Sequence, residues 1–303
     1  MPNTAIVKID NVNLTLSNLD KVFYTASNFT KAQVIDYYIR IAPVLLSHLQ
    51  GHPLTLKRYP NGATAKFFYQ KECPAFRPSW LSTVPVWSDS KKRSINFCLA
   101  QDLPSLVWAV NLAAIELHTS LSRSANPLCP TMLVFDLDPG YPATILHCAE
   151  VALTLYKVLL EKNIKSFPKT SGSKGMQVYI PLNTPDASYT QTKTFAHTLA
   201  KTLEQQMPSL VVSNMKKVLR KGKIFIDWSQ NDKHKTTVCV YSLRAKKYPT
   251  VSTPITWEEV ETAYLKQDVS LLSFTAGQVL ERVQKMGDLF APVVSLQQTL
   301  PSL

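Results

Sequence analysis

The sequence lacks several features that would place it in a common class. No apolar run reaches membrane-spanning length, and the first residues, Met1 to Ala5, do not resemble a secretory signal. The five cysteines are widely scattered and form no Cys-x-x-Cys pair, which argues against a zinc ribbon. There is no internal repeat and no low-complexity tract. We therefore expect a cytosolic protein whose thiols are reduced.

The composition describes an ordinary folded protein with an excess of positive charge. Of the 303 residues, 45% are hydrophobic and 18% are charged, which is enough for one large or two medium domains with real cores. The net charge is +12, and such an excess raises the local concentration of a polyanion, of which nucleic acid is the usual one. A basic protein of this kind could equally have a solubility or ribosome-associated role.

The hydrophobic patterns predict alternating strands and helices joined in several places by short turns. Thr30 and Gln33 form a capping-box pattern that starts a helix, and Gly51 ends it. Short turns require antiparallel neighbours, which favours a mixed α+β chain over a doubly wound parallel one. We expect strands at 54–58, 66–69, 132–138, 223–227 and 236–241, a strand, loop and strand over 164–182, and helices at 106–117, 143–162 and 188–206, with a final helix ending near Met286.

The most informative stretch is the apolar run that ends in Asp136 and Asp138. In a strand these two acids share one side of the sheet, while Leu133, Phe135 and Leu137 line the other. Like charges so close together repel, and a divalent cation between them relieves the repulsion because Mg²⁺ and Mn²⁺ prefer oxygen ligands. The alternative is a strand end whose two acids are solvated.

Asp227 adds a third acid at the end of another predicted strand. The three acids could converge from adjacent strands to hold two metal ions, an arrangement suited to phosphoryl transfer. Between them, the loop from Lys169 to Tyr179 carries two glycines, several hydroxyls and Lys174, which make a plausible phosphate cradle. The Walker A spacing is absent, and a well-solvated hairpin remains the alternative.

Basic and aromatic residues interleave at two further places. Lys57, Phe67, Phe68 and Lys71 offer cations for a nucleic-acid backbone and ring faces for base stacking. The densest positive run contains Lys216, Lys217 and Arg220, although such a run is usually a solvated surface loop. His118 could contact a ligand in the same site, but a lone histidine is more often structural.

Several longer motifs, in their order along the chain, resemble the polymerase domain of bacterial ligase D. That family belongs to the archaeo-eukaryotic primase superfamily and serves non-homologous end joining. The resemblance runs from about Val12 to Val283. It is carried by residues 20–24, 54–62, 67–71, 115–118, 134–139, 170–175, 225–231 and 241–244.

The resemblance implies a single primase-polymerase domain over 1–303. Its N-terminal α/β subdomain would cover about 1–125, and a catalytic subdomain binding metal and nucleotide would cover about 126–290. The expected core has antiparallel or mixed sheets flanked by helices. Asp136, Asp138 and Asp227 match the family's catalytic metal ligands.

The resemblance also implies the remaining site residues and the partners. The nucleotide site would contain Ser171, Lys174, Gln177, Gln230, Arg244, His118 and Lys57. The DNA contacts would be made by Lys21, Lys31, Phe67, Phe68, Lys71, Lys216, Lys217 and Arg220. The lysines at 21 and 31 match residues that bind the 5′-phosphate across a gap or break. The expected partners are DNA with gaps or broken ends, Ku and a DNA ligase. The substrates would be ribo- or deoxyribonucleoside triphosphates, with ribonucleotides preferred. The cofactor would be Mn²⁺ or Mg²⁺.

The chain departs from the family pattern at one position. The phosphate loop usually ends Ser-x-x-Lys-Gly-x-His, and Gln177 stands where the histidine is expected. Glutamine can donate a hydrogen bond but cannot carry a positive charge, so activity could be weaker or its pH dependence altered. No Lys-x-Asp-Gly nucleotidylation motif occurs, so sealing would come from another domain or protein.

We interpret the sequence as a primase-like repair polymerase that adds nucleotides to 3′ ends at gaps and breaks. We expect it in the bacterial or archaeal cytoplasm, associated with the nucleoid. Two alternatives remain. The first is a primase or lesion-copying primase-polymerase of the same superfamily. The second is a non-catalytic module that bridges broken DNA ends.

Overall fold

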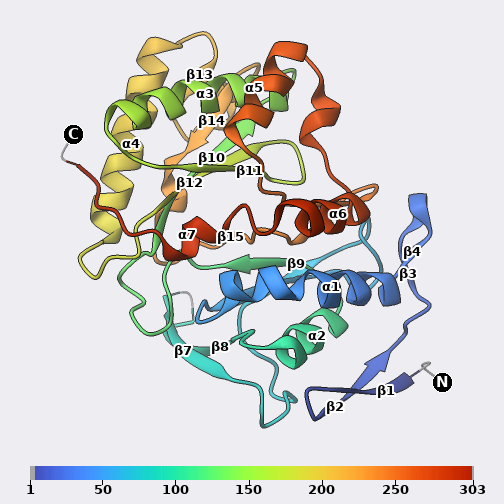
Figure 1. Cartoon of the computed structure of the whole chain (residues 1–303). Coiled ribbons are helices and arrows are strands. Elements are labelled where there is room, and N and C mark those ends of the chain that lie inside the picture. The colour runs from blue at the N-terminus through green and yellow to red at the C-terminus, as the bar shows by residue number, and fades with distance from the viewer. Residues whose placement is uncertain (1–3, 90, 302–303) are drawn as a thin grey trace.

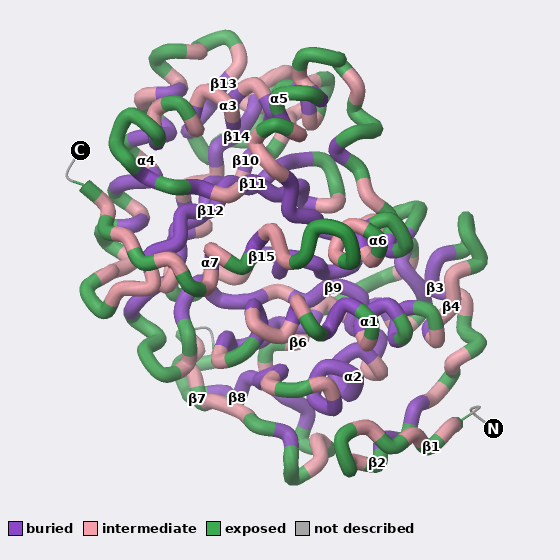
Figure 2. The backbone as a smooth tube through the Cα atoms, viewed as in Figure 1, coloured by how far each residue is buried: buried purple, intermediate pink, exposed green. Residues whose placement is uncertain are grey.

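The protein contains two main β-sheets, each covered by helices, that lie next to each other along the molecule (Figure 1). The computed structural model describes residues 4–89 and 91–301. Strands of both sheets are almost entirely buried, as the largely purple tube through β9, β10 and β12 shows (Figure 2). This mixed α+β architecture with antiparallel sheets confirms the predicted fold class.

The sheet of the C-terminal half has five strands in the order β11-β12-β10-β14-β13. All neighbours are antiparallel except β13 and β14, which are parallel. Alternate β10 residues such as Leu133 and Phe135 pack into a hydrophobic core with the adjoining helices. The strands are β10 (Met132–Pro139), β11 (Phe167–Thr170), β12 (Met176–Pro181), β13 (Val211–Val212) and β14 (Ile224–Asp227), and the helices are α3 (Ile145–Glu161), α4 (Tyr189–Gln206) and α5 (Trp257–Lys266).

The sheet of the N-terminal half has six strands. Its order is β15-β9-β5-β8-β7, with β6 also paired to β5. Residues of this sheet and of helices α1, α2, α6 and α7 form a second core, in which α6 and α7 pack against α1. The strands are β5 (Leu54–Arg58), β6 (Phe68–Gln70), β7 (Thr83–Ser88), β8 (Arg93–Cys98), β9 (Ala114–Thr119) and β15 (Thr237–Val238), and the helices are α1 (Lys31–Leu49), α2 (Leu103–Asn111), α6 (Ala276–Met286) and α7 (Ala291–Ser295).

Three small hairpins and four 3₁₀ turns complete the described chain. The hairpins pair β1 (Thr4–Ile9) with β2 (Val12–Ser17), β3 (Val22–Tyr24) with β4 (Phe29–Thr30), and β16 (Leu243–Ala245) with β17 (Pro249–Val251). The 3₁₀ turns are η1 (Thr25–Ser27), η2 (Lys217–Arg220), η3 (Trp228–Gln230) and η4 (Val269–Leu272). Within residues 4–89 and 91–301, no helix combines the length and apolarity needed to cross a membrane.

The longest local patterns were predicted correctly. Thr30 accepts from the backbone of Gln33, and the Gln33 side chain accepts from the Thr30 backbone, so the predicted capping box starts α1. The predicted helices over 143–162 and 188–206 match α3 and α4. The predicted boundary between subdomains near residue 125 stays a prediction.

Two predicted elements were wrong. The expected helix over 106–117 ends at Asn111, because Ala113 adopts a positive φ of 64° and the chain then enters β9. The strand expected at 236–241 covers only Thr237–Val238, and it does not pair with the strand expected at 223–227. Instead, β14 pairs with β10 in one sheet and β15 pairs with β9 in the other. The segment at 231–236 therefore links the two sheets beside the acidic site.

The expectation that all thiols are reduced was also wrong. Cys73 and Cys98 form a disulfide with a Cα–Cα distance of 5.2 Å. The pairing of Cys73 N–H with the carbonyl of Asn96 brings the two cysteines together although 25 residues separate them in sequence. Cys129, Cys148 and Cys239 are free and buried.

Candidate active site

The three candidate metal ligands lie on one face of the five-stranded sheet. Asp136 and Asp138 alternate with core residues along β10, and Asp227 ends the neighbouring strand β14. The antiparallel register places Asp136 directly opposite Asp227, and Asp138 opposite Phe225. Because successive side chains in a strand alternate faces, the apolar β10 residues enter the core and the three acids share the other side.

The proximity of these carboxylates changes their proton affinity. Burial and the neighbouring charge of Asp138 raise the pKa of Asp136 to about 7, with a smaller contribution from Asp227. The pKa of Asp138 is raised by partial burial and by the charge of Asp227. Carboxylates that repel each other in this way are suited to share a cation, which replaces the proton.

The present orientation of Asp227 is set by the turn that follows it. Its Oδ1 accepts from the backbone N–H and the hydroxyl of Ser229, at 3.0 and 2.5 Å, and its Oδ2 accepts from Gln230 Nε2 at 3.3 Å. Within the described parts of the chain, no group of three or more His, Cys, Asp or Glu side chains has the arrangement of a metal site. Carboxylate oxygens are the donors that hard cations such as Mg²⁺ or Mn²⁺ prefer, so these three acids are the residues that could hold such an ion.

The predicted phosphate loop is the hairpin between β11 and β12, and it lies beside these acids. Gly175 passes so close to Leu137 that a Cβ there would lie 2.2 Å from the Leu137 carbonyl oxygen. Gly172 has a φ of +64° and passes equally close to Val251. The hydroxyl of Ser171 accepts from the backbone N–H groups of residues 173 and 175, which holds the loop in shape. Lys174 is exposed at its tip.

A cavity of about 540 Å³ brings most of the predicted site together. Residues from both sheets form its walls. They include candidates for binding the metal, the phosphates and the sugar. The predicted residues that line it are Asp136, Asp138, Ser171, Lys174, Gln177, Gln230, Arg244, His118 and Lys71. The site is thus formed where the two sheets face each other.

Glu116 was missed by the sequence analysis, although it organises several of the predicted residues. Its buried carboxylate accepts from Tyr59 Oη at 3.1 Å and Lys57 Nζ at 3.3 Å. It also contacts His118 Nε2 at 3.1 Å and Arg244 Nε at 3.4 Å. Burial alone would raise the pKa of Glu116, but the hydrogen bond from His118 and the charge of Arg244 hold it well below its usual range. Glu116 and His118 are two residues apart on β9, a signal that the predicted helix concealed.

Lys169 is a second missed residue, and it contacts the position at which this chain departs from the family pattern. The fully buried ammonium donates to Gln177 Oε1 at 2.6 Å and to Ser252 Oγ at 2.7 Å. The Gln177 amide nitrogen donates to Thr237 Oγ1 at 2.9 Å, and Gln177, the register partner of Asp136, lowers the pKa of that carboxyl. Burial and the charge of Arg244 lower the pKa of Lys169 to about 7.

The predicted DNA contacts lie in different environments. Phe67 and Phe68 are 49% and 45% exposed, and the cations of Lys57 and Arg58 lie 4.3 and 5.1 Å from their respective ring centres. Lys21 is exposed and donates to Asn61 Oδ1 at 3.1 Å.

Lys31, by contrast, is only 3% exposed and donates to the Ser17 carbonyl at 2.6 Å and to Asn111 Oδ1 at 2.8 Å. Burial lowers its pKa to about 8. Its expected contact with a 5′-phosphate would require the ammonium to leave at least one of these partners.

The predicted basic run around η2 borders the acidic site. The Arg220 guanidinium lies 3.6 Å from the ring centre of Phe225, which is the register partner of Asp138. Its Nη2 donates to the Met215 carbonyl at 2.7 Å. Lys216 and Lys217 are exposed beside it. This run therefore places the Arg220 cation near Asp138, whose pKa it lowers, while none of the three predicted residues of the run lines the cavity.

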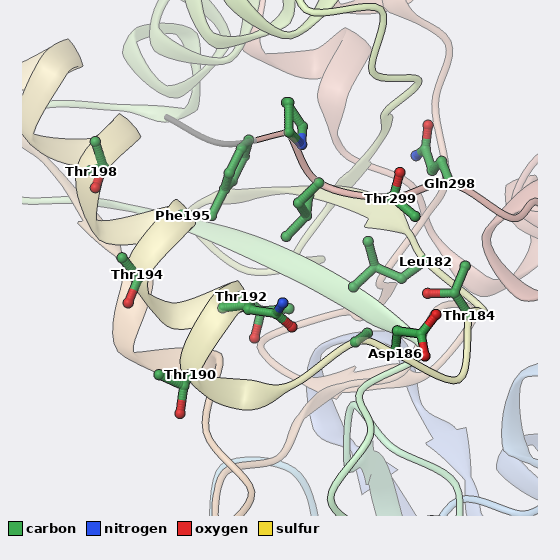
Figure 3. Close-up of a pocket in the computed structure, with 14 residues that line it drawn as sticks. Leu182, Thr184, Asp186, Thr190, Thr192, Thr194, Phe195, Thr198, Gln298 and Thr299 are labelled. Carbon is green, nitrogen blue, oxygen red and sulfur yellow. The ribbon is translucent and has the colours of Figure 1, made fainter.

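A separate cavity of about 400 Å³ lies between α4 and the C-terminal segment (Figure 3). Threonines of α4, such as Thr190 and Thr194, lie along one side of it, and Gln298 and Thr299 lie on the other. Its lining contains the carboxylate of Asp186 and no lysine, arginine or histidine, so it is not suited to phosphate.

Comparison with known proteins identifies the family to which a chain with these acids and this phosphate loop belongs. Residues 30–290 match the family described as LigD, primase-polymerase domain. The chain belongs to this family. Members of the LigD primase-polymerase family are metal-dependent, DNA-directed nucleotidyltransferases, and the present chain is an enzyme of this type.

In the similar proteins, the region that matches this chain is part of a longer protein. The chain is 38% identical over 280 residues to the multifunctional non-homologous end joining protein LigD of Mycolicibacterium smegmatis, covering 92% of this chain and 36% of that protein. It is 30% identical over 274 residues to the bifunctional non-homologous end joining protein LigD of Bacillus subtilis, covering 90% and 43%. The chain thus spans less than half the length of either relative.

A solved structure matches nearly the whole LigD-type domain. The polymerase domain from Mycobacterium tuberculosis ligase D, in complex with DNA, superimposes with a TM-score of 0.85 at 37% identity. The match covers 94% of this chain and 99% of that one. The LigD primase-polymerase domain therefore accounts for both sheets and for the cavity between them.

Proposed function

We propose that this chain adds nucleotides to 3′ ends at gaps and double-strand breaks during non-homologous end joining. The observation that carries the proposal is the convergence of Asp136, Asp138 and the Ser171–Lys174 loop on one cavity, with Asp227 in register with Asp136. An acidic metal site facing a phosphate cradle is the arrangement that nucleotidyl transfer from a triphosphate requires.

Each group of residues has a distinct part in this reaction. Asp136, Asp138 and Asp227 would hold one or two divalent cations, Mn²⁺ or Mg²⁺, which lower the pKa of the attacking 3′-hydroxyl and neutralise charge on the α-phosphate. The loop N–H groups and Lys174 bind the triphosphate and hold it in line. Arg244 and Gln230 contact the nucleotide, and His118 lies at the sugar, where a preference for ribonucleotides would be set.

The surface outside the cavity would hold DNA. The exposed rings of Phe67 and Phe68 stack on template bases, and Lys71 contacts the backbone. Lys216, Lys217 and Arg220 position the primer end. Lys21 and Lys31 recognise the 5′-phosphate across the gap. Ku and a DNA ligase are the expected partners, the ligase because this chain has no nucleotidylation motif.

The decisive experiment is nucleotide incorporation on a short gapped duplex with a recessed 5′-phosphate. Wild type and Asp136→Ala are compared with Mn²⁺ and either ribo- or deoxyribonucleotides, and the wild type is repeated on a 5′-hydroxyl substrate. Incorporation that needs Asp136 and falls without the phosphate supports the proposal. Phosphate-independent incorporation would favour a primase. Phosphate-dependent binding without incorporation would favour an end-bridging module.

A further inference from the structure

A second cavity, of about 370 Å³, adjoins the proposed nucleotide cavity on the side of the β7–β8 hairpin. Lys71, His234, Lys235 and Thr236 line both cavities, so the two are contiguous. Most of the expected nucleotide contacts line the first cavity, and Lys71 is the one predicted site residue among the described residues that line the second. Its size falls within the range of small-ligand pockets.

The lining of this second cavity combines an apolar floor with a basic mouth. The floor contains the buried side chains of Ile95 and Phe97. Lys71, Lys233 and Lys235 stand at the mouth, and no ion pair involves them within the described residues. Lys235 donates to Ser229 Oγ at 3.1 Å. An apolar surface next to lysines that form no ion pair matches a nucleobase together with its phosphate.

Trp87 supplies the aromatic face of this cavity. Its side chain is 55% exposed and lines the cavity, so that the ring is accessible to a stacking partner. The indole Nε1 donates to Asp89 Oδ1 at 2.9 Å, and Asp89 Oδ2 contacts His234 Nε2 at 3.0 Å. Among the described residues of the lining, Asp89 is the one carboxylate, and both of its oxygens are engaged. The hydrogen bond to Asp89 orients the indole ring.

The hairpin that carries Trp87 is itself attached to the segment that carries Lys71. Glu72 accepts from Arg93 through both carboxylate oxygens, at 2.8 and 3.0 Å, and from Lys91 Nζ at 2.5 Å. The β7–β8 hairpin is thus linked at its turn to Glu72 and His234, and at its other end by the disulfide between Cys73 and Cys98. A platform held at both ends loses little conformational entropy when a base stacks on it.

We propose that Trp87 and the adjoining lysines form a subsite for an unpaired nucleotide next to the one in the catalytic cavity. The occupant is a nucleobase with its phosphate, and we assign it to a single nucleic-acid strand that continues from the catalytic cavity. The subsite rests on the proposed function, because it requires the first cavity to hold a nucleotide. It extends that function by adding a binding site for a strand that is not base-paired.

The test compares full-length wild type, Trp87→Ala and Trp87→Phe, with Trp80→Ala as the matched control. Trp80 is also partly exposed but does not line either cavity. The probes are ATP with Mn²⁺ and a 5′-phosphorylated tetranucleotide of deoxyadenylate. Binding affinity is measured by titration, and stacking is measured as quenching of the tryptophan fluorescence that Trp87→Phe lacks.

We expect Trp87→Ala to weaken tetranucleotide binding by roughly tenfold, which corresponds to the loss of one base–aromatic stack, while its ATP affinity is unchanged. Trp87→Phe, which keeps an aromatic face, should stay within about threefold of wild type. If Trp87→Ala instead abolishes a second bound ATP, the subsite stands and its occupant is a free nucleotide.

Two results would overturn the subsite. One is equal loss in Trp87→Ala and Trp87→Phe without quenching in the wild type, because the hydrogen bond to Asp89 would then matter and the stack would not. The other is unchanged binding of both probes in Trp87→Ala. A wild type that fails to bind ATP would contradict the proposed function instead, and the tetranucleotide series would still decide the subsite.

Discussion

Lys169 donates to Gln177 Oε1 across 2.6 Å, and Tyr179 Oη donates to the same oxygen at 3.3 Å. With its oxygen engaged by these two donors, the amide directs its nitrogen to Thr237, beside Asp136. The register makes the contact possible, since Gln177 on β12 lies opposite both Lys169 on β11 and Asp136 on β10. A buried cation thus lies behind the position at which relatives are expected to carry histidine.

We expect Lys169→Met to lower kcat for incorporation by about tenfold with a smaller effect on the nucleotide KM, because the amide loses its fixed orientation toward Asp136. The check is steady-state incorporation in Lys169→Met, Gln177→Leu and the double variant. If Lys169 acts through Gln177, the double variant is no slower than Gln177→Leu alone. Additive losses would contradict this coupling. Urea unfolding of the same variants separates a loss of stability from a loss of orientation.

The sequence could predict what depends on neighbours in the chain. Thr30 and Gln33 are three residues apart and set the start of α1, and Asp136 and Asp138 share a face because a strand has a period of two. Lys169 was not predictable, because its partner Ser252 lies 83 residues away and a lysine inside a strand gives no sign of burial. Glu116 was hidden by an apolar run that fits a helix as well as a strand.

The raised pKa of Asp136 predicts a specific pH dependence of metal binding. Because this pKa is about 7, the folded protein holds a proton there that a metal must displace. Between pH 6 and pH 7 we expect the apparent Mn²⁺ affinity to increase by up to about tenfold, and to level off above that range. Isothermal titration with Mn²⁺ at several pH values measures this. In Asp136→Asn, Mn²⁺ should bind more weakly, and its affinity should increase much less between pH 6 and pH 7.

The same shift has a consequence for stability without metal. A carboxyl whose folded pKa lies above its unfolded value favours the folded state when protonated, so its contribution is fully present below about pH 4 and is lost as the pH rises through 7. With a chelator present, Asp136→Asn should therefore raise Tm more at pH 8 than at pH 5. An equal effect at both values would argue against the buried, repelling arrangement. Thermal melts at the two pH values are sufficient.

Glu116 is expected to act as a positioning residue for the nucleotide site. Glu116→Gln removes the charge that holds Arg244 and His118, and we expect the nucleotide KM to rise by about tenfold or more. The matched control is Glu259→Gln, which breaks an ion pair to Arg282 far from the cavity lining. The control should leave KM unchanged while lowering Tm slightly. A KM unaffected by Glu116→Gln would leave Glu116 with a structural role alone.

The two lysines expected at the 5′-phosphate should behave differently, because only one of them is exposed. Lys21 contacts Asn61 at the surface, so Lys21→Glu should not change Tm. Reversing its charge should nevertheless reduce gap filling on a 5′-phosphate substrate by about tenfold, with little effect on extension of an open primer. Incorporation on the two substrates at low and moderate salt measures this, because a lost phosphate contact matters most at low ionic strength.

Lys31→Met, in contrast, removes the donor that links Ser17 to Asn111, and it should lower Tm whether or not DNA is present. If Lys31 also releases these partners to bind the phosphate, the variant loses the difference between 5′-phosphate and 5′-hydroxyl substrates as well. Lys31→Arg separates the two roles, because it keeps the charge but does not fit the buried pair of acceptors. If Lys31→Met still distinguishes 5′-phosphate from 5′-hydroxyl substrates, the phosphate contact belongs to Lys21. Lys31 then has only the structural role of holding β2 and α2 together.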